Sequence, residues 1–436
     1  PQDGYDIIST IDVYIQDIAH HALLKQLEYY SADHGCVVVM ETKTGHIKAI
    51  SNLGRADDGS YYETQNYAIA ESHEPGSTFK LVDLIAVLDD KKADTSTVYN
   101  SNGGEIQYYR RKVRDSHKGG YGKISLARGF EVSSNTILVQ SVYNSYKDNP
   151  KQFVDRINSY GLNKPLGLPI KGEGIPVIPQ PGTDKWSGVS LPWMAFGYGV
   201  SITPLQTLTL YNAVANDGVM VKPIFVSEIK EWNKTIKKYN TEVINPKICS
   251  QETLNKVRAV LQNVVKKGTG SKLYSKDFSM AGKTGTAQVN YKDKSKLYYA
   301  SSFVGYFPAD EPKYSCIVVV HKPNVAAGYY GADVAGPVFK RIAQKIFTDS
   351  PSTNHVKNID AKVFSQEKSY GNYYKAVEKE VQIVPNVKGM DGMDAVALLE
   401  NLGLKVKVIG VGRVKKQSLT SGQAFNKNQT IIIELS

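Results

Sequence analysis

One stretch of the sequence constrains the fold more than any other, because it reads as a helix with almost no polar face. From Phe79 to Leu88 every residue is apolar except Lys80 and Asp83. Such a helix is stable only when other elements cover it on most sides. Pro75 marks its beginning, since proline is favoured in a first helical turn. We therefore expect a central helix inside a large domain, and 436 residues suffice for two or three domains.

The segments around this helix show both helical and extended patterns. A first helix is expected from a Thr10 cap to Leu27, followed by a hairpin whose turn lies at 43–45. Between Asn144 and Pro192 Gly and Pro are frequent, which predicts irregular chain rather than sheet. Further helices are expected at 203–215, 254–267 and 337–346, and further strands at 287–289, 302–306 and 316–321.

The chain changes character after the last of these helices. Residues 349–382 are polar with little periodicity, which predicts a linker between a large domain at 1–348 and a small one at 383–436. In the small domain the patterns predict a helix at 394–402 and strands at 384–387, 405–409 and 430–435.

Composition and cysteine count exclude several classes of protein. Lys and Arg exceed Asp and Glu by 53 − 42 = 11, which favours anionic surroundings. The basic clusters lack interleaved aromatic residues, so we expect no nucleic-acid partner. Cys36, Cys249 and Cys316 are too far apart for a disulfide framework and are expected to be buried thiols. No apolar run could span a membrane, and a chain that begins at Pro1 reads as a processed fragment.

The central helix carries the first candidate for chemistry. Ser77 and Lys80 lie three residues apart at its start and face one side, so the amine can take the hydroxyl proton. The helix dipole and free N–H groups favour the anion that develops, which makes Ser77 a candidate nucleophile. The S-x-x-K pattern alone is weak, because it recurs at 227–230 and 365–368.

Two further motifs follow Ser77 in a defined order. They are S-x-N at 133–135 and K-T-G at 283–285, the set found in penicillin-binding proteins and serine β-lactamases. A second K-T-G at 43–45 sits in a hairpin turn ahead of Ser77, and a second S-x-N at 352–354 falls in the expected linker. Both copies are discounted. The histidines are scattered without H-E-x-x-H spacing, so we expect no metal site and no cofactor.

With these motifs and their flanks, the chain resembles the class B, monofunctional penicillin-binding proteins, the D,D-transpeptidases that cross-link peptidoglycan. The resemblance extends from Asp6 to Ile346. The matching segments are 9–12 with Gln16, 74–80, 197–199, 203–206, 215–218, 268–270, 281–286 and 302–306. The tail resembles one PASTA domain in its segments 384–387, 389–390 and 403–404.

The resemblance implies a fold and an activity. The fold is α+β, of the β-lactamase/D,D-transpeptidase kind, with an antiparallel sheet flanked by helices and followed by a small αβ PASTA domain. The activity is cross-linking of D-Ala-D-Ala stem peptides through a serine acyl-enzyme that β-lactams also form. The expected location is the outer face of the bacterial cell membrane, held by an N-terminal anchor missing from this chain. A PASTA tail suggests septal synthesis, with a glycan polymerase and division proteins as partners.

The resemblance also assigns roles to individual residues. Ser77 attacks the penultimate D-Ala carbonyl, and Lys80 acts as base, its pKa lowered by burial and by Lys283. Ser133 relays protons to the leaving amine, and Lys283 supplies positive potential. The backbone N–H groups of Ser77 and Thr286 form the oxyanion hole. The residues expected to bind substrate are Asn135, Thr284, Gly285 and Thr286.

Two alternatives remain open. One is a β-lactamase or β-lactam sensor of the same fold, and the other is a non-catalytic scaffold that binds wall fragments. Ser134 stands where class A β-lactamases usually have Asp, and no Glu is placed to activate a deacylating water, which argues against hydrolysis. The intact motif set argues against the scaffold.

Overall fold

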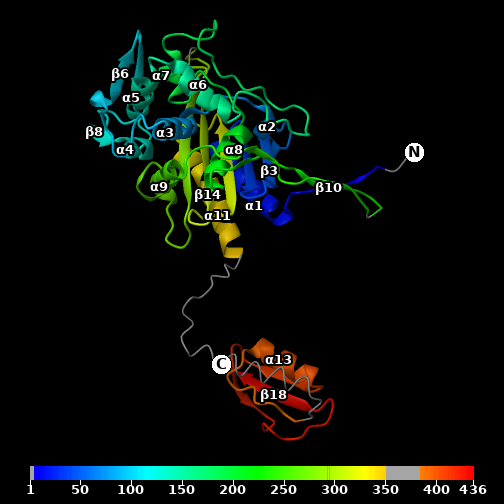
Figure 1. Ribbon diagram of the computed structural model, residues 1–436. Helices are drawn as coiled ribbons and strands as arrows, with labels where there is room; N and C mark the ends of the chain where they lie inside the picture. Colours follow the sequence, from blue (N-terminus) through cyan, green and yellow to red (C-terminus); the bar gives the residue numbers. More distant parts are fainter. Residues whose placement is uncertain (1–3, 233, 292, 294, 350–382) are drawn as a thin grey trace. The chain divides into compact units, whose positions relative to one another are not determined.

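The structure is a computed structural model that describes residues 4–232, 234–291, 293, 295–349 and 383–436 (Figure 1). These residues form two compact units, one ahead of residue 350 and one from Ile383 on. The linker predicted at 349–382 lies outside the described residues, except for Asp349, which ends helix α11. No helix among the described residues combines the length and apolarity needed to cross a membrane.

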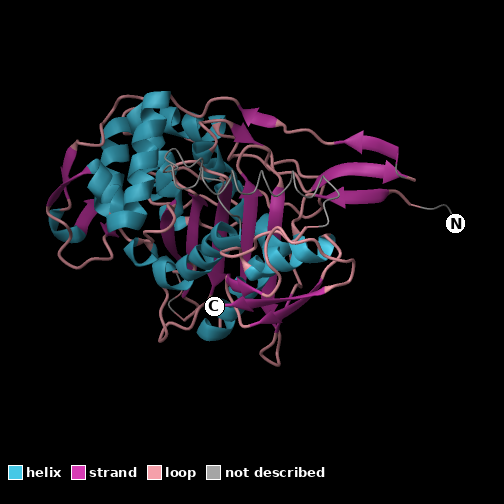
Figure 2. Cartoon of the chain, turned by 90° about the horizontal axis from the view of Figure 1, so that it is seen from below, coloured by secondary structure: helices cyan, strands magenta, loops and turns pink. Residues whose placement is uncertain are grey.

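A six-stranded antiparallel sheet organises the first unit, as predicted (Figure 2). Its strands, in spatial order, are β13 (Ala281–Val289), β14 (Tyr298–Phe307), β15 (Tyr314–His321), β2 (His34–Glu41), β3 (Ile47–Arg55) and β4 (Tyr61–Tyr62). The first strand, β13, begins six residues earlier than the predicted strand at 287–289, because its glycines and Lys283 interrupt the apolar pattern.

Both faces of this sheet are buried. In β15, Cys316, Val318 and Val320 belong to the core on one side, whereas Ile317 and Val319 belong to the core on the other. Since side chains alternate along a strand, a strand covered on both faces reads as an uninterrupted apolar run. This is why the two central strands, β2 and β15, are almost wholly apolar in sequence.

Helices cover the two faces. One face carries α1 (Val13–Tyr30) and α11 (Gly336–Asp349). On the other face α8 (Pro204–Ala215) and α9 (Gln251–Lys267) contact the sheet, and α3 (Lys80–Asp89), α4 (Leu126–Glu131) and α5 (Asn135–Tyr146) extend the same core as a layer of helices beyond them. In α3 every residue from Lys80 to Leu88 is buried, which confirms the predicted central helix. A short 3-10 turn, η1 (Gly76–Phe79), leads into it.

Smaller elements complete the first unit. They are α2 (Tyr67–Ala70), α6 (Pro150–Ser159), α7 (Ser190–Met194), α10 (Gly331–Val334), η2 (Asn102–Gly104), η3 (Ser271–Leu273), the ribbon β1 (Asp6–Ser9), β10 (Val226–Glu231) and β11 (Lys234–Lys238), and the pairs β5 (Val98–Asn100) with β8 (Lys123–Ser125), β6 (Glu105–Tyr108) with β7 (Arg111–Arg114), and β9 (Met220–Val221) with β12 (Val243–Asn245).

Two predictions for this unit are wrong in detail. Asp12, not Thr10, caps the first helix, and the Thr10 hydroxyl instead lies 2.8 Å from the carbonyl oxygens of Ile47 and Ile224. The segment 144–192 contains no strand among its described residues, as predicted, but it includes helices α6 and α7. Pro150 begins α6 at a position where proline favours a helix rather than a loop.

The second unit is a three-stranded sheet with one helix. Its elements are α13 (Gly392–Asn401), β16 (Lys405–Ile409), β17 (Val414–Gln417) and β18 (Thr430–Leu435), in strand order β16-β18-β17. The strand predicted at 384–387 is wrong: only Ile383 forms a bridge there, with Ala424, and Pro385 has no N–H to continue a ladder. The apolar patterns of the sequence did not predict β17, because most of its residues are polar.

The three cysteines are free and buried, as predicted. Burial raises the pKa of each thiol, so none is a ready nucleophile.

Candidate active site

The turn that carries Ser77 packs directly against strand β13. A Cβ atom on Gly285 would lie 2.9 Å from Thr78 Cγ2, and a Cβ atom on Gly76 would lie 3.1 Å from Ala287 Cβ. Larger residues at either position would push the turn and the strand apart. The sequence therefore keeps both positions small, and this places Ser77 beside the outer edge of the sheet, where β13 has a neighbour on one side only.

Two lysines from different elements converge on one hydroxyl. Lys80 Nζ donates to the carbonyl oxygen of Ser133 at 2.8 Å and lies 3.3 Å from its Oγ, while Lys283 Nζ lies 2.8 Å from the same Oγ. Lys80 also donates to Asn135 Oδ1 at 2.7 Å. Four of the predicted site residues thus meet here, although they are separated by up to about two hundred positions in the sequence.

Ser133 adopts a strained backbone conformation. Its φ is 59°, in the left-handed region that residues other than glycine rarely occupy. The turn follows α4, and the N–H of Ser133 donates to Phe130 O. This conformation presents both the carbonyl oxygen and the hydroxyl of Ser133 to Lys80.

Burial sets the charge state of the two lysines. Neither is exposed to solvent. Desolvation lowers the pKa of Lys80 to about 7, although the charges of Asp115 and Asp83 partly oppose the shift. The pKa of Lys283 is held well below its usual value by burial and by the charge of Lys80. Burial therefore accounts for the predicted lowering of the Lys80 pKa. The charge repulsion between the two lysines instead lowers the pKa of Lys283.

Sequence reasoning missed Asp115, which holds the Ser133 turn in place. Its carboxylate accepts hydrogen bonds from the Ser134 hydroxyl at 3.0 Å, and from the Thr136 N–H and hydroxyl at 2.9 Å. The residue comes directly after β7, eighteen positions before the S-x-N motif. No motif marks it, so only the folded chain brings it to the site.

The free edge of β13 points its polar backbone groups toward this site. The Gln288 N–H donates to the Tyr198 hydroxyl at 2.8 Å, and Lys283 Nζ donates to the Thr284 carbonyl oxygen at 3.0 Å. In an extended strand the N–H and C=O of every second residue face the same edge. The N–H of Thr286, midway between these two residues, therefore faces the free edge beside the Ser77 turn.

The predicted substrate-binding side chains already have protein partners. The Asn135 amide donates to Arg114 O at 2.7 Å. The Thr284 hydroxyl lies 2.7 Å from the Thr269 hydroxyl, and the Thr286 hydroxyl accepts from the Gly331 N–H at 3.0 Å. A hydroxyl that accepts from a backbone N–H keeps its own hydrogen free to donate. Thr286 can therefore donate to a carboxylate without losing this contact.

The discounted motif copies lie in ordinary structural positions. Ser227 is on strand β10, where its hydroxyl donates to Ile8 O, and Lys230 of that copy pairs with Glu228. Lys43 is exposed in a hairpin turn and pairs with Asp217. The copies at 352–354 and 365–368 lie outside the described residues.

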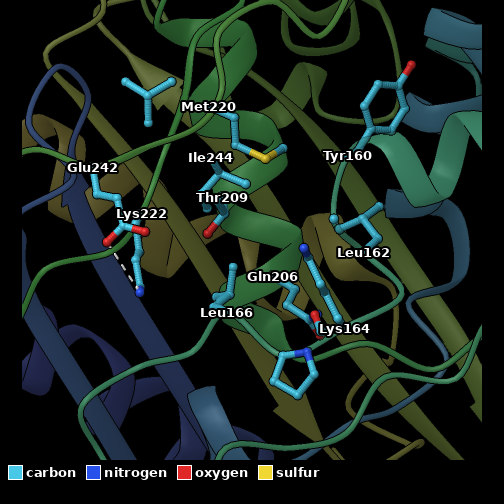
Figure 3. A pocket seen from close by; sticks show the side chains of 13 residues that line it. Tyr160, Leu162, Lys164, Leu166, Gln206, Thr209, Met220, Lys222, Glu242 and Ile244 are labelled. Atoms are coloured by element: carbon cyan, nitrogen blue, oxygen red, sulfur yellow. Dashed lines mark hydrogen bonds and ion pairs between the residues drawn. The ribbon is translucent and has the colours of Figure 1, made fainter.

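A separate cavity of about 240 Å³ lies away from these residues, between α8 and the segments around it (Figure 3). Lys164 and the ion pair of Lys222 with Glu242, at 3.4 Å, are among its polar groups. None of the predicted site residues lines it, so the cavity has no part in the chemistry of Ser77.

Comparison with known proteins gives two family matches. The transpeptidase domain of penicillin-binding proteins matches residues 35–344, and the PASTA domain matches residues 382–436. Stage V sporulation protein D of Bacillus subtilis is 29% identical over 452 residues, which cover 100% of this chain and 66% of that protein. The probable peptidoglycan D,D-transpeptidase PenA of Neisseria gonorrhoeae is 30% identical over 355 residues, 78% of this chain and 56% of that protein.

Solved structures agree with this fold. Penicillin-binding protein 3 of Mycobacterium tuberculosis complexed with aztreonam is 27% identical, and the match covers 80% of each chain at a TM-score of 0.70. Penicillin-binding protein 2X of Streptococcus thermophilus, at 21% identity and a TM-score of 0.68, covers 99% of this chain and 63% of its own. The chain spans two thirds or less of the length of the two curated relatives described above. The chain belongs to the transpeptidase family of penicillin-binding proteins, of class B, with a PASTA domain at its C-terminal end, which confirms the resemblance found in its motifs.

Proposed function

We propose that the protein is a serine D,D-transpeptidase that cross-links peptidoglycan stem peptides and that β-lactams acylate at Ser77. The observation that carries the proposal is the convergence of Lys80 and Lys283 on the Ser133 hydroxyl beside the Ser77 turn. The printed functions of relatives such as PenA, a probable peptidoglycan D,D-transpeptidase, support it.

The first half of the proposed reaction forms an acyl-enzyme. Neutral Lys80 takes the proton of the Ser77 hydroxyl, and the Ser77 oxygen bonds to the carbonyl carbon of the penultimate D-Ala. The N–H groups of Ser77 and Thr286 donate to the oxygen that becomes negative. The C–N bond then breaks, and the leaving D-Ala amine takes a proton from Lys80 through the Ser133 hydroxyl.

The second half transfers the acyl group. The amine of another stem peptide attacks the ester carbon and gives its proton to Lys80 through the Ser133 hydroxyl. The new amide bond forms, the ester bond to Ser77 breaks, and the proton returns from Lys80 to the Ser77 oxygen. The terminal carboxylate of the donor peptide binds near Lys283 Nζ and the Thr286 hydroxyl, with Thr284 and Gly285 completing the strand edge. Asn135 binds a substrate amide while it orients Lys80.

We place this reaction at the outer face of the bacterial cell membrane, where peptidoglycan is built, with the whole protein anchored there. A septal role, with a glycan polymerase and division proteins as partners, is part of the same proposal. It is supported by a relative named peptidoglycan D,D-transpeptidase FtsI, of Buchnera aphidicola, which is 27% identical over 357 residues.

Mass spectrometry after exposure to penicillin tests the proposal. We expect one penicilloyl adduct per chain, on the peptide that contains Ser77, with a long lifetime. Ser77→Ala should give no adduct, whereas Ser227→Ala, at the discounted copy of the motif, should react as the unmodified protein does. Rapid hydrolysis of the adduct would instead identify a β-lactamase, and a chain that never forms the adduct would be a non-catalytic scaffold.

A further inference from the structure

A second group of titratable side chains lies outside the site around Ser77. His34 on β2 and His321 on β15 are directly opposite each other in the sheet, and their rings stack at 4.4 Å. Glu71, which follows helix α2, places Oε2 2.9 Å from His34 Nε2 and 3.7 Å from His321 Nε2. One nitrogen or oxygen from each of the three residues lies within 4.8 Å of the others.

This set of atoms matches the coordination chemistry of zinc. Two imidazoles and one carboxylate, with a fourth position for water, form a recurring zinc environment. Zinc bonds of about 2.0–2.2 Å in a tetrahedron put ligand atoms about 3.3 Å apart, and the two distances from Glu71 lie on either side of that value. Because the ring planes are only 11° apart, the rings must turn out of their stack before both nitrogens can point at one ion.

The surroundings of His34 also fit a ligand role. Asp33 Oδ2 lies 2.8 Å from His34 Nδ1, so a carboxylate orients this ring and leaves Nε2 facing Glu71. His321 is only 2% exposed, and its Nδ1 has no hydrogen-bond partner among the described residues. This nitrogen is not the one near Glu71, so the ring of His321 is buried with one unsatisfied polar atom and, unlike His34, has no carboxylate in the described part of the chain that orients it.

We propose that His34, Glu71 and His321 bind one divalent transition-metal ion of the zinc class. The site would join two central strands of the sheet to the segment that leads into the Ser77 turn, since Glu71 lies six residues ahead of Ser77. His73 stands at the margin of the site, with its ring 5.1 Å from that of His321. The ion stabilises this segment and takes no part in acylation.

Cobalt titration of the full chain, stripped of metal and of any affinity tag, tests the proposal. We expect one cobalt ion per chain, with the visible ligand-field bands of a four-coordinate site that zinc then abolishes. His34→Gln and Glu71→Gln, which keep side-chain volume, should each weaken binding at least about tenfold. His21→Gln is the matched control, because His21 is an exposed histidine on α1 that pairs with Asp17, and it should bind as the unmodified chain does.

A second measurement separates binding at this site from weak surface binding. Excess zinc should raise the melting temperature of the unmodified chain and of His21→Gln, because a ligand that binds only the folded state stabilises it. The same zinc should leave the melting temperature of Glu71→Gln unchanged. Absence of cobalt bands in the unmodified chain would overturn the proposal. So would bands of equal strength in His34→Gln and Glu71→Gln, or a loss of binding in His21→Gln.

Discussion

The pH dependence of acylation is the sharpest consequence of the site. If neutral Lys80 takes the proton from Ser77, the rate constant for acylation follows the fraction of Lys80 that is unprotonated. With a pKa of about 7 instead of the ordinary 10.5, that fraction at pH 7 is one half. At the ordinary value it would be about one in 3,000.

The expected profile follows from this shift. Because Lys80 must lose a proton to act, the rate should fall as pH drops through 7, about fiftyfold between pH 7 and pH 5. Above pH 8 it should level off, since nearly all of Lys80 is then neutral. Stopped-flow measurement of a chromogenic cephalosporin, with pre-equilibrated enzyme and a correction for hydrolysis by buffer, gives the profile.

Two variants test whether Lys80 itself causes the pH profile. Lys80→Ala should react at a rate too low to measure while remaining folded, and Lys237→Ala, which removes an exposed lysine, should reproduce the full profile. A rate that continues to rise tenfold per pH unit from 7 to 9 would refute the reasoning, because Lys80 would then have an ordinary pKa. A rate independent of pH from 5 to 9 would exclude Lys80 as the base.

Three further predictions concern the packing of the Ser77 turn, the charge near Lys80 and the independence of the C-terminal unit. Gly285→Ala should destabilise the protein by about 1–3 kcal/mol in thermal unfolding and slow acylation, because its Cβ would overlap Ser302 Oγ on the neighbouring strand and press on Thr78; an unchanged melting temperature would contradict the packing argument. Asp115→Asn removes a charge that raises the pKa of Lys80, so the acid limb of the acylation profile should move to lower pH; a shift to higher pH would show that Asp115 acts otherwise. Truncation after Asp349 should leave the acylation rate within about twofold, since each compact unit has its own core; a severalfold loss in a folded truncation would show that the tail supports the site.

The sequence was sufficient to predict the central helix and the sheet because these elements follow simple patterns. A helix covered on all sides and strands covered on both faces are apolar along their whole length, and α3, β2 and β15 read that way. The predicted site residues could be chosen from the order of their motifs, and three predicted catalytic residues, Lys80, Ser133 and Lys283, meet in space with Asn135.

Other features depend on contacts that no local pattern records. Asp115 reaches the Ser133 turn from a separate hairpin, and Asp12, two residues after Thr10 and also of a good capping type, is the residue that caps α1. The expectation of no metal site rested on spacing along the chain, whereas the cluster of His34, Glu71 and His321 is assembled by strand pairing. Motif spacing along the chain cannot reveal a cluster of that kind.

The exposed edge of β13 has a consequence for what the protein can accept as a substrate. A strand with an unpaired edge is a template for any extended chain, because backbone hydrogen bonds carry no information about side chains. Here the template is short: the Tyr198 hydroxyl already occupies the Gln288 N–H, and Lys283 occupies the Thr284 carbonyl oxygen. Between these two occupied groups lies the N–H of Thr286, which faces the free edge. An incoming peptide that pairs with the strand at Thr286 must therefore compete with Lys283 or Tyr198 if it extends further along the edge, which favours a chain terminus over the middle of a polypeptide.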